Sequence, residues 1–190
     1  MMIEEIKKLV KEACKKSTNH FGYGAWSHHI SFVVKYAKLL ARRLGADEEI
    51  CEIAALLHDY ASVMNKDWYP EHHLHSARLS EKILLKYNYP KEKIEAVKHC
   101  IISHRASKNI PQETIEAKIV ASADSMAHFN NVHSLLYLAF VTHKMDIEQG
   151  TRWVLDKLER SWNKLIPEAK EIVKEKYNAI KLALINGIEN

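Results

Sequence analysis

The sequence predicts an all-α protein with the form of a compact helical bundle. Apolar residues recur every three or four positions in most segments, which is the spacing of one face of an α-helix. Segments with the strict alternation of a half-buried strand are almost absent. Only five glycines and four prolines occur in 190 residues, so little of the chain is left for linkers. With 47% hydrophobic residues the chain can bury one substantial core, and we expect a single domain over 1–190.

Capping and turn signals separate the predicted helices in chain order. These signals are Gly22 and Gly24, Gly45-Ala46-Asp47, Asn65-Lys66-Asp67, Tyr89-Pro90, Asn109-Ile110-Pro111 and Pro167. They divide the helices that the apolar periodicity predicts, with ends uncertain by about two to four residues. The expected helices are 2–17, 27–44, 47–60, 71–88, 91–104, 112–130, 132–145, 147–163 and 167–185.

Two of these helices carry histidines on faces that should turn to the core. His29 lies on the same stripe as Val33 and Leu40, so its imidazole should point inward. The ridge through Ala54 continues four residues on to His58, and Asp59 follows one step round the helix. Both segments therefore direct polar side chains into apolar surroundings.

A third polar position lies near residue 124. Asp124 shares a helix face with small residues such as Ala117 and Ala127, so another helix can approach closely. An isolated buried charge is costly, and a buried polar group without a hydrogen bond costs roughly 2–7 kcal/mol. Taken singly, such histidines are more often hydrogen-bonded core residues, and such aspartates caps or ion-pair partners. Together they are tolerated if they share a cation, and imidazole with carboxylate suits divalent Mn, Fe, Co, Ni or Zn.

The order of these residues resembles the HD-domain metal-dependent phosphohydrolase superfamily. Its pattern of a His, a His-Asp pair and a distant Asp is carried here by HHISFV, AALLHDYA and KIVASADSM. The resemblance covers an HD-like core at about 25–130, flanked by an N-terminal helix and C-terminal helices. It implies a divalent transition metal held by His29, His58, Asp59 and Asp124. The His-x-x-x-Val spacing selects His29 over His28.

Two further histidines match positions of the same superfamily. The segment HHLHSARLSEKIL selects His72 by spacing, and IEAVKHCIISHR selects His104. In relatives, these histidines either hold a second metal or line the phosphate pocket, so the resemblance implies Asp59, His72 and His104 as catalytic residues. The other histidines of these segments are explained equally well as partly exposed surface residues: His73, His75 and His99.

The branch of the superfamily is narrowed by what the chain lacks. Tyr60-Ala61-Ser62 follows the His-Asp pair, where the cyclic-dinucleotide branch usually carries Ile-Gly-Lys, and no Gly-Tyr-Pro signature follows. The bifunctional alarmone enzymes need long additional regions for which 190 residues leave no room. The resemblance is therefore to the small single-domain members.

The charge and cysteine content exclude several classes of binding partner and of metal site. The formal charge is +4, but no basic stripe with stacking aromatics occurs, so we expect no nucleic-acid partner. The absence of an 18-residue apolar run and of a signal-peptide pattern predicts a cytoplasmic protein with no membrane partner. Three cysteines without Cys-x-x-Cys spacing argue against disulfides and thiolate zinc sites. A positive pocket would attract an anionic substrate, and the candidate phosphate contacts are Lys66, Arg105 and Lys108.

The predicted activity is hydrolysis of a nucleotide or another small phosphorylated metabolite by a metal-activated water. Asp59 or Asp124 would accept a proton, while His72 or His104 would protonate the leaving oxygen or orient the phosphate. Two alternatives stay open: a non-catalytic metal- or nucleotide-binding module, and a di-iron oxygenase-type enzyme in which His72 and His104 hold a second iron. Four tryptophans are expected as core or interface anchors, which leaves a homodimer open: Trp26, Trp68, Trp153 and Trp162.

Overall fold

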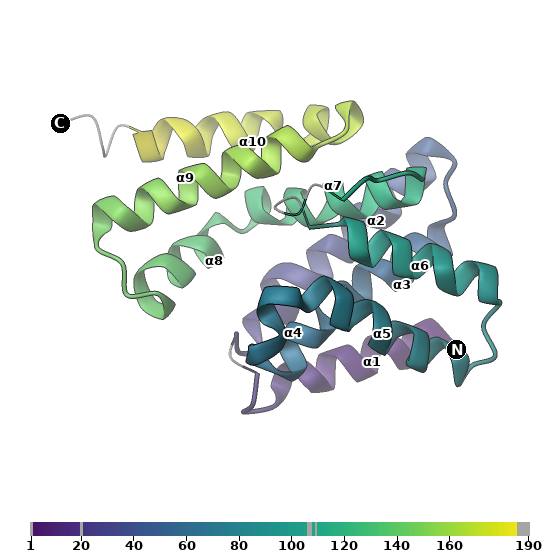
Figure 1. Ribbon diagram of the computed structural model, residues 1–190. Helices are drawn as coiled ribbons and strands as arrows, with labels where there is room; N and C mark the ends of the chain where they lie inside the picture. Colours follow the sequence, from purple (N-terminus) through teal and green to yellow (C-terminus); the bar gives the residue numbers. More distant parts are fainter. Residues whose placement is uncertain (1, 20, 106–107, 109, 186–190) are drawn as a thin grey trace.

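The all-α prediction is confirmed by the structure, a computed structural model that describes residues 2–19, 21–105, 108 and 110–185. Within this part of the chain every regular element is helical (Figure 1). In chain order the elements are α1 (Met2–Lys15), η1 (Ala25–Ile30), α2 (Ser31–Leu44), α3 (Glu48–Leu57), α4 (Tyr60–Met64), η2 (Lys66–Glu71), α5 (His72–Leu85), α6 (Lys91–Ser103), α7 (Ile115–Asn130), α8 (Val132–Tyr137), η4 (Leu138–Thr142), α9 (Ile147–Lys164) and α10 (Pro167–Ile185). None of the helices in these ranges is both long enough and apolar enough to cross a bilayer.

Helix α7 lies at the middle of the bundle. It packs against α2, α3 and α6, and also against α9 and α10, which lie together beside it as an antiparallel pair (Figure 1). Its alanines, among them Ala121 and Ala123, are fully buried, and their small side chains allow close helix approach. Asp124 therefore sits on the helix that both parts of the bundle share.

The helix ends at 44–48 follow the predicted capping pattern. Gly45 takes the left-handed conformation at the end of α2, with φ of 67°, which a residue with a Cβ rarely adopts. The Asp47 side chain accepts a hydrogen bond of 3.1 Å from the Ile50 N–H and so caps α3. Helix α3 is buried on all sides, which brings the residues that follow it into the interior.

The predicted helix over 47–60 is wrong at its carboxyl end, because the helix is interrupted at His58 and Asp59 and a new helix starts at Tyr60. Asp59 has φ of −107° and ψ of 9°, in the sparsely populated bridge region. The Ser62 hydroxyl donates to the Asp59 carbonyl at 2.8 Å, and the Ala61 N–H donates to the Ser76 hydroxyl at 3.0 Å, so backbone groups released by the break are satisfied. Adjacent side chains on a continuous helix diverge by about 100°. The break lets His58 and Asp59 face one point.

Other predicted boundaries also shift. The helix expected at 27–44 starts with a π-helical turn, η1, which carries His29 and holds buried Trp26. The helix expected at 132–145 is divided into α8 and the π-helical η4. Thr114 caps α7, so residues 112–114 precede that helix. Sequence periodicity does not signal π-helical turns, which insert one residue into a helix and occur frequently at functional sites.

An aromatic cluster fixes α9 and α10 to α7. Trp162 of α9 stacks on Tyr177 of α10 with ring centroids 4.4 Å apart and an interplanar angle of 8°. Phe129 of α7 meets both rings edge-on, at 6.4 Å and 5.5 Å. Such contacts contribute about 0.5–1.5 kcal/mol each beyond burial. The cluster holds one face of α9 against the middle of the bundle.

Leu39 and Leu40 on α2 give a matched test of this packing. Leu40 is fully buried and Leu39 is 44% exposed. Leu40→Ala should lower the free energy of unfolding by about 2–5 kcal/mol, because it removes contacts and leaves a cavity. Leu39→Ala should change it by about 0.5 kcal/mol or less. Denaturant unfolding of both variants measures the difference, and equal losses would contradict the placement of this helix.

Candidate metal centre

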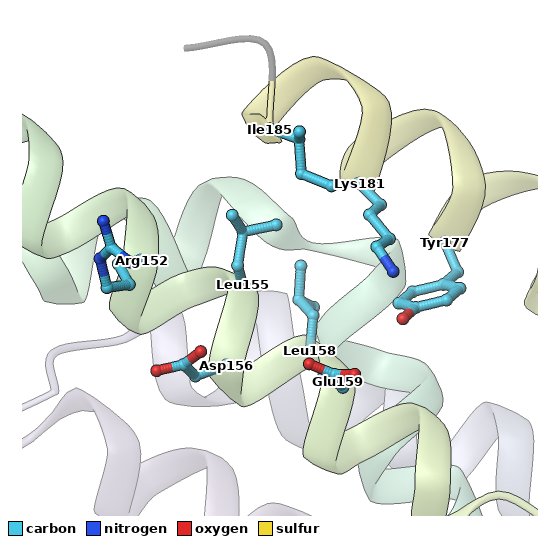
Figure 2. Close-up of a pocket in the computed structure, with 8 residues that line it drawn as sticks. All are labelled: Arg152, Leu155, Asp156, Leu158, Glu159, Tyr177, Lys181 and Ile185. Carbon is cyan, nitrogen blue, oxygen red and sulfur yellow. The ribbon is translucent and has the colours of Figure 1, made fainter. Parts of the chain in front are cut away.

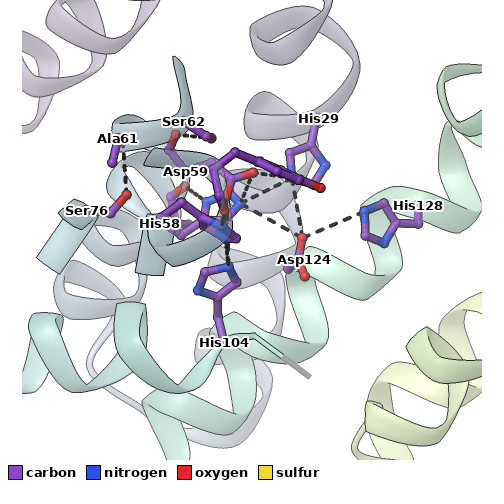
Figure 3. Close-up of polar contacts among 12 residues, drawn as sticks. His29, His58, Asp59, Ala61, Ser62, Ser76, His104, Asp124 and His128 are labelled. Carbon is purple, nitrogen blue, oxygen red and sulfur yellow. Dashed lines mark hydrogen bonds and ion pairs between the residues drawn. The ribbon is translucent and has the colours of Figure 1, made fainter. Parts of the chain in front are cut away.

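Four predicted metal ligands come together between η1, the α3–α4 junction and α7. His29 Nε2 lies 3.2 Å from His58 Nε2 and 3.4 Å from Asp59 Oδ2. Asp124 Oδ1 lies 3.4 Å from His29 Nε2 and 3.9 Å from His58 Nε2. Figure 3 shows these side chains directed toward one another from separate elements. We call this set the first cluster.

A second cluster shares Asp59. Its other oxygen, Oδ1, lies 3.3 Å from His72 Nε2 and 3.9 Å from His104 Nε2. The two Nε2 atoms of His72 and His104 are 3.3 Å apart. Because Oδ2 of Asp59 faces the first cluster, this carboxylate lies between the two groups and can serve both. Three overlapping sets have the ligand types and spacing that can hold a metal ion: His29, His58 and Asp59; His29, Asp124 and His128; and Asp59, His72 and His104.

The imidazoles are oriented with one nitrogen toward the backbone and the other toward the clusters. In each case Nδ1 contacts a carbonyl oxygen three residues earlier: His58 with Ala55 at 2.8 Å, His72 with Tyr69 at 2.8 Å, and His104 with Ile101 at 2.6 Å. A carbonyl only accepts, so Nδ1 carries the proton and Nε2 of the neutral ring presents a lone pair. When both rings of a facing pair are neutral, their two lone pairs cannot hydrogen bond to each other. A shared cation satisfies these nitrogens.

The charges of the clusters follow from burial and proximity. Burial disfavours the imidazolium of His58, but the carboxylates of Asp59 and Asp124 outweigh it and raise the pKa of His58 to about 9. Burial, together with neighbouring His58, lowers the pKa of His104 to about 3. For Asp59 burial acts in the opposite direction, yet the surrounding histidines hold its pKa well below the usual range. A cation that binds here must therefore displace the proton of His58.

The donor set fits a divalent transition metal ion. Imidazole nitrogens and carboxylate oxygens suit Mn, Fe, Co, Ni and Zn. The nitrogens that face the clusters are held by backbone contacts that orient the rings, as outer partners of metal-binding histidines do. The assignment of His29, His58, Asp59 and Asp124 as ligands stays a prediction, and so do the catalytic roles of Asp59, His72 and His104.

Helix α9 brings in a lysine that sequence reasoning did not select. Lys164 Nζ donates to Asp124 Oδ2 at 2.9 Å and to the His104 carbonyl at 2.9 Å. Its side chain is 9% exposed, so this is a largely desolvated ion pair. While Lys164 holds one oxygen of Asp124, the other oxygen faces the first cluster. The lysine thus orients a predicted metal ligand.

His128 of α7 is a second residue that was missed. Its ring stacks on His29 at 5.3 Å and 13°, and its Nε2 lies 4.0 Å from Asp124 Oδ1. Ser161 of α9 lies 3.3 Å from the other nitrogen. The available signals were the four-residue step from Asp124 to His128 and the polar stripe of Lys157, Ser161 and Lys164 on the buried face of α9. Lysines on a helix are usually solvated, so the sequence pattern alone does not single out this stripe.

The predicted phosphate contacts lie farther out. Lys108 forms an ion pair of 3.0 Å with Glu71, and Arg105 donates to the Pro70 carbonyl. Lys66 is exposed and has no ion pair with the residues that the structure describes. Their substrate contacts remain predictions.

The surface histidines follow expectation with one exception. His75 and His99 are partly exposed, as expected. His73 is 2% exposed, so its interpretation as a surface histidine is wrong.

A surface pocket between α9 and α10 is separate from these clusters. Half of its lining is charged, from Arg152, Asp156, Glu159 and Lys181, and the rest is apolar or aromatic (Figure 2). At 100° per residue, Arg152, Asp156 and Glu159 lie on a different face of α9 from Lys157 and Lys164. The pocket contains no histidine and offers no comparable metal-binding set.

Comparison with known proteins assigns the family. Residues 26–128 match the family model of the HD domain. The chain belongs to the HD-domain family. This superfamily consists generally of metal-dependent hydrolases, and its domains bind divalent metals, which agrees with the His and Asp clusters. Lys157, Ser161 and Lys164 lie beyond the matched residues.

Solved structures share most of the fold. Lin1889 from Listeria innocua matches with a TM-score of 0.70 and 25% identity, over 98% of this chain and 95% of that chain. Bacillus subtilis YpgQ, solved in complex with ADP, matches with a TM-score of 0.69 and 22% identity, over 97% and 94%. A predicted HD superfamily hydrolase from an uncultured Thermotogales bacterium gives 0.58 and 23%, over 82% and 84%. The shared fold therefore includes the helices outside the HD match.

A curated relative matches over a shorter stretch. An uncharacterized protein of Clostridium beijerinckii is 32% identical over 107 residues, which make up 54% of this chain. The match spans 62% of that relative's length. This relative therefore gives no information on the activity.

Removal of Asp59 should release metal from both clusters. Purified protein should retain at least one tightly bound transition metal ion per chain, and Asp59→Ala should lose it, because this carboxylate serves both groups. Exposed Asp67 gives the matched control: Asp67→Ala should retain metal as the unsubstituted protein does. Elemental analysis after gel filtration measures the content. Full occupancy in Asp59→Ala would overturn the assignment.

Metal affinity should rise with pH until about pH 9. Protonated His58 cannot donate a lone pair, and its pKa of about 9 means that the metal-free protein carries this proton at neutral pH. Below that pKa, affinity should increase about tenfold per pH unit for one displaced proton, and above it affinity should level off. Titration calorimetry in buffers of different ionisation enthalpy should find about one proton released near pH 7. Constant affinity from pH 7 to 9 would rule out this displacement.

Proposed function

We propose that this protein hydrolyses a phosphoester or phosphoanhydride bond in a nucleotide or another small phosphorylated metabolite. The observation that carries the proposal is the convergence of His29, His58, Asp59 and Asp124, whose ring Nε2 atoms and carboxylate oxygens face one point. The HD-domain match supports this chemistry. A divalent transition metal ion at this point would lower the pKa of a bound water from 15.7 toward about 7 and offset charge on the phosphate.

The residues around the two clusters would have different roles in proton transfer during the proposed reaction. Asp59 lies between the clusters and is ionised, so it can accept a proton from the attacking water. His104 is neutral at physiological pH because its pKa is lowered to about 3, which suits it to orient rather than to protonate. His72 Nε2 lies 3.3 Å from Asp59 and, when protonated, would donate to the leaving oxygen. Lys164 keeps Asp124 in place throughout.

The proposed nucleotide substrate has two supports. YpgQ, which has the same fold, was solved with ADP. In this chain Tyr69 is 50% exposed, stacks on His72 at 5.6 Å and 18°, and lies 5.5 Å from the ring of Phe21. Aromatic faces next to a phosphate-binding centre can stack on a base. We therefore place the base on the Tyr69 side of the clusters.

A di-iron oxygenase-type enzyme is the second candidate. The observation in its favour is the cluster of Asp59, His72 and His104, which can hold a second ion beside the first. Such an enzyme would consume oxygen only with iron present. A metal- or nucleotide-binding module without turnover would show neither activity, and nucleotides would then raise the melting temperature of the metal-loaded protein.

Phosphate release separates these candidates. Turnover of nucleotides or an aryl phosphate should require added Mn, Co, Ni, Mg or Zn, stop with chelator and increase with pH through a pKa near 7, as expected for a metal-activated water. His104→Ala should lower turnover, and its metal content should show whether one ion or two is held. The matched control is His75→Ala, which alters a partly exposed histidine outside both clusters. The proposal of hydrolysis would be contradicted if the unsubstituted protein turned over no phosphoester in a broad panel faster than the Asp59→Ala variant does.

A further inference from the structure

Helix α9 directs three polar side chains toward the metal-binding clusters. Lys157, Ser161 and Lys164 are spaced by four and three residues, so they lie on one face of the helix. That face packs on α7, where Ser161 meets His128 and Lys164 meets Asp124. Lys157 therefore lies on the same face as Ser161 and Lys164, both of which have contacts with α7.

Lys164 and Lys157 differ in what they contact. Lys164 is engaged by the Asp124 carboxylate and the His104 carbonyl. Lys157 forms no ion pair within 4.0 Å with any described carboxylate, although it is only partly exposed. Asp124 acts to raise the pKa of Lys157, and Lys157 acts to lower the pKa of His128, so these charges interact. Lys164 thus holds a predicted metal ligand, whereas Lys157 has no direct carboxylate partner among the described residues.

The charge balance around the first cluster favours an anion at Lys157. Asp59 and Asp124 carry two negative charges, and Lys157 and Lys164 carry two positive charges that offset them. Burial lowers the pKa of Lys157, while Asp124 acts in the opposite direction, so the ammonium is already poorly solvated. A divalent cation leaves the centre with a net charge that a phosphate dianion matches. Ammonium next to phosphate forms a charge-assisted hydrogen bond.

We propose that Lys157 forms a phosphate-binding subsite near Asp124, supplied by a helix outside the HD-domain match. The subsite rests on the proposed function, because it holds the phosphate group of the substrate that this function requires. Its ligand is the phosphate oxygen that points away from the metal ligands and toward α9. Lys157 is a substrate-binding residue, whereas Lys164 is a positioning residue that acts through Asp124.

Binding of inorganic phosphate to the metal-loaded protein tests the subsite without turnover. Lys157→Met should weaken phosphate binding roughly tenfold, the loss expected for one charge-assisted hydrogen bond. Its metal content and melting temperature should match those of the unsubstituted protein. Lys157→Arg keeps the charge and should retain most of the affinity. Lys174 on α10 is exposed, and Lys174→Met gives a control for charge removal that should bind phosphate normally.

The two lysines of α9 should give different signatures. Lys164→Met should lower metal affinity about 10–100-fold, because partners that orient a metal ligand typically contribute that much. Lys157→Met should leave metal affinity unchanged and, where turnover is measured, raise KM more than it lowers kcat. Calorimetry with the metal alone and then with phosphate separates the two effects.

Each outcome decides a specific claim. Unchanged phosphate affinity in Lys157→Met would overturn the subsite and leave the proposed hydrolysis intact. Loss of metal in that variant would assign Lys157 a positioning role and also overturn the subsite. A tenfold loss of phosphate affinity in a protein that turns over no phosphoester would support the subsite and overturn the proposed hydrolysis.

Discussion

The carboxylate of Asp59 is the group on which the rest of the candidate centre depends. Its two oxygens face different clusters, with His29 and His58 on one side and His72 on the other. This position exists only because α3 ends before His58 and α4 starts after Asp59. A continuous helix would separate the two side chains, so the local break is part of the site's construction.

Helix α7 links this centre to the C-terminal helices. Asp124 faces the first cluster with one oxygen and Lys164 with the other, so α9 is coupled to a predicted metal ligand. The aromatic contacts of Trp162 and Tyr177 hold α9 in the register that this ion pair requires. Removing one partner of a buried pair typically costs 3–5 kcal/mol, because the other charge is left uncompensated. The C-terminal helices are therefore structural support for the centre as well as a cover for α7.

The fold class and much of the centre could be predicted from local pattern. The stripe through Val33 and Leu40 placed His29 inward, and small residues on α7 did the same for Asp124. The break at Asp59 could not be predicted, since neither glycine nor proline marks it and the apolar pattern continues through it. Lys164 was missed for another reason: a lysine's role is decided by the carboxylate that tertiary packing brings to it. Periodicity describes one helix at a time and contains no information on that partner.

Crystals grown with manganese would test the central claim most directly, through an anomalous difference map. The account predicts a peak bounded by His29 Nε2, His58 Nε2, Asp59 Oδ2 and Asp124 Oδ1, at about 2.0–2.3 Å from each coordinating atom. His58 would then keep its Nδ1 contact with the Ala55 carbonyl and give up its Nε2 contact with Asp59. Manganese found only elsewhere, with the His58 and Asp59 contact intact, would contradict the assignment of this site.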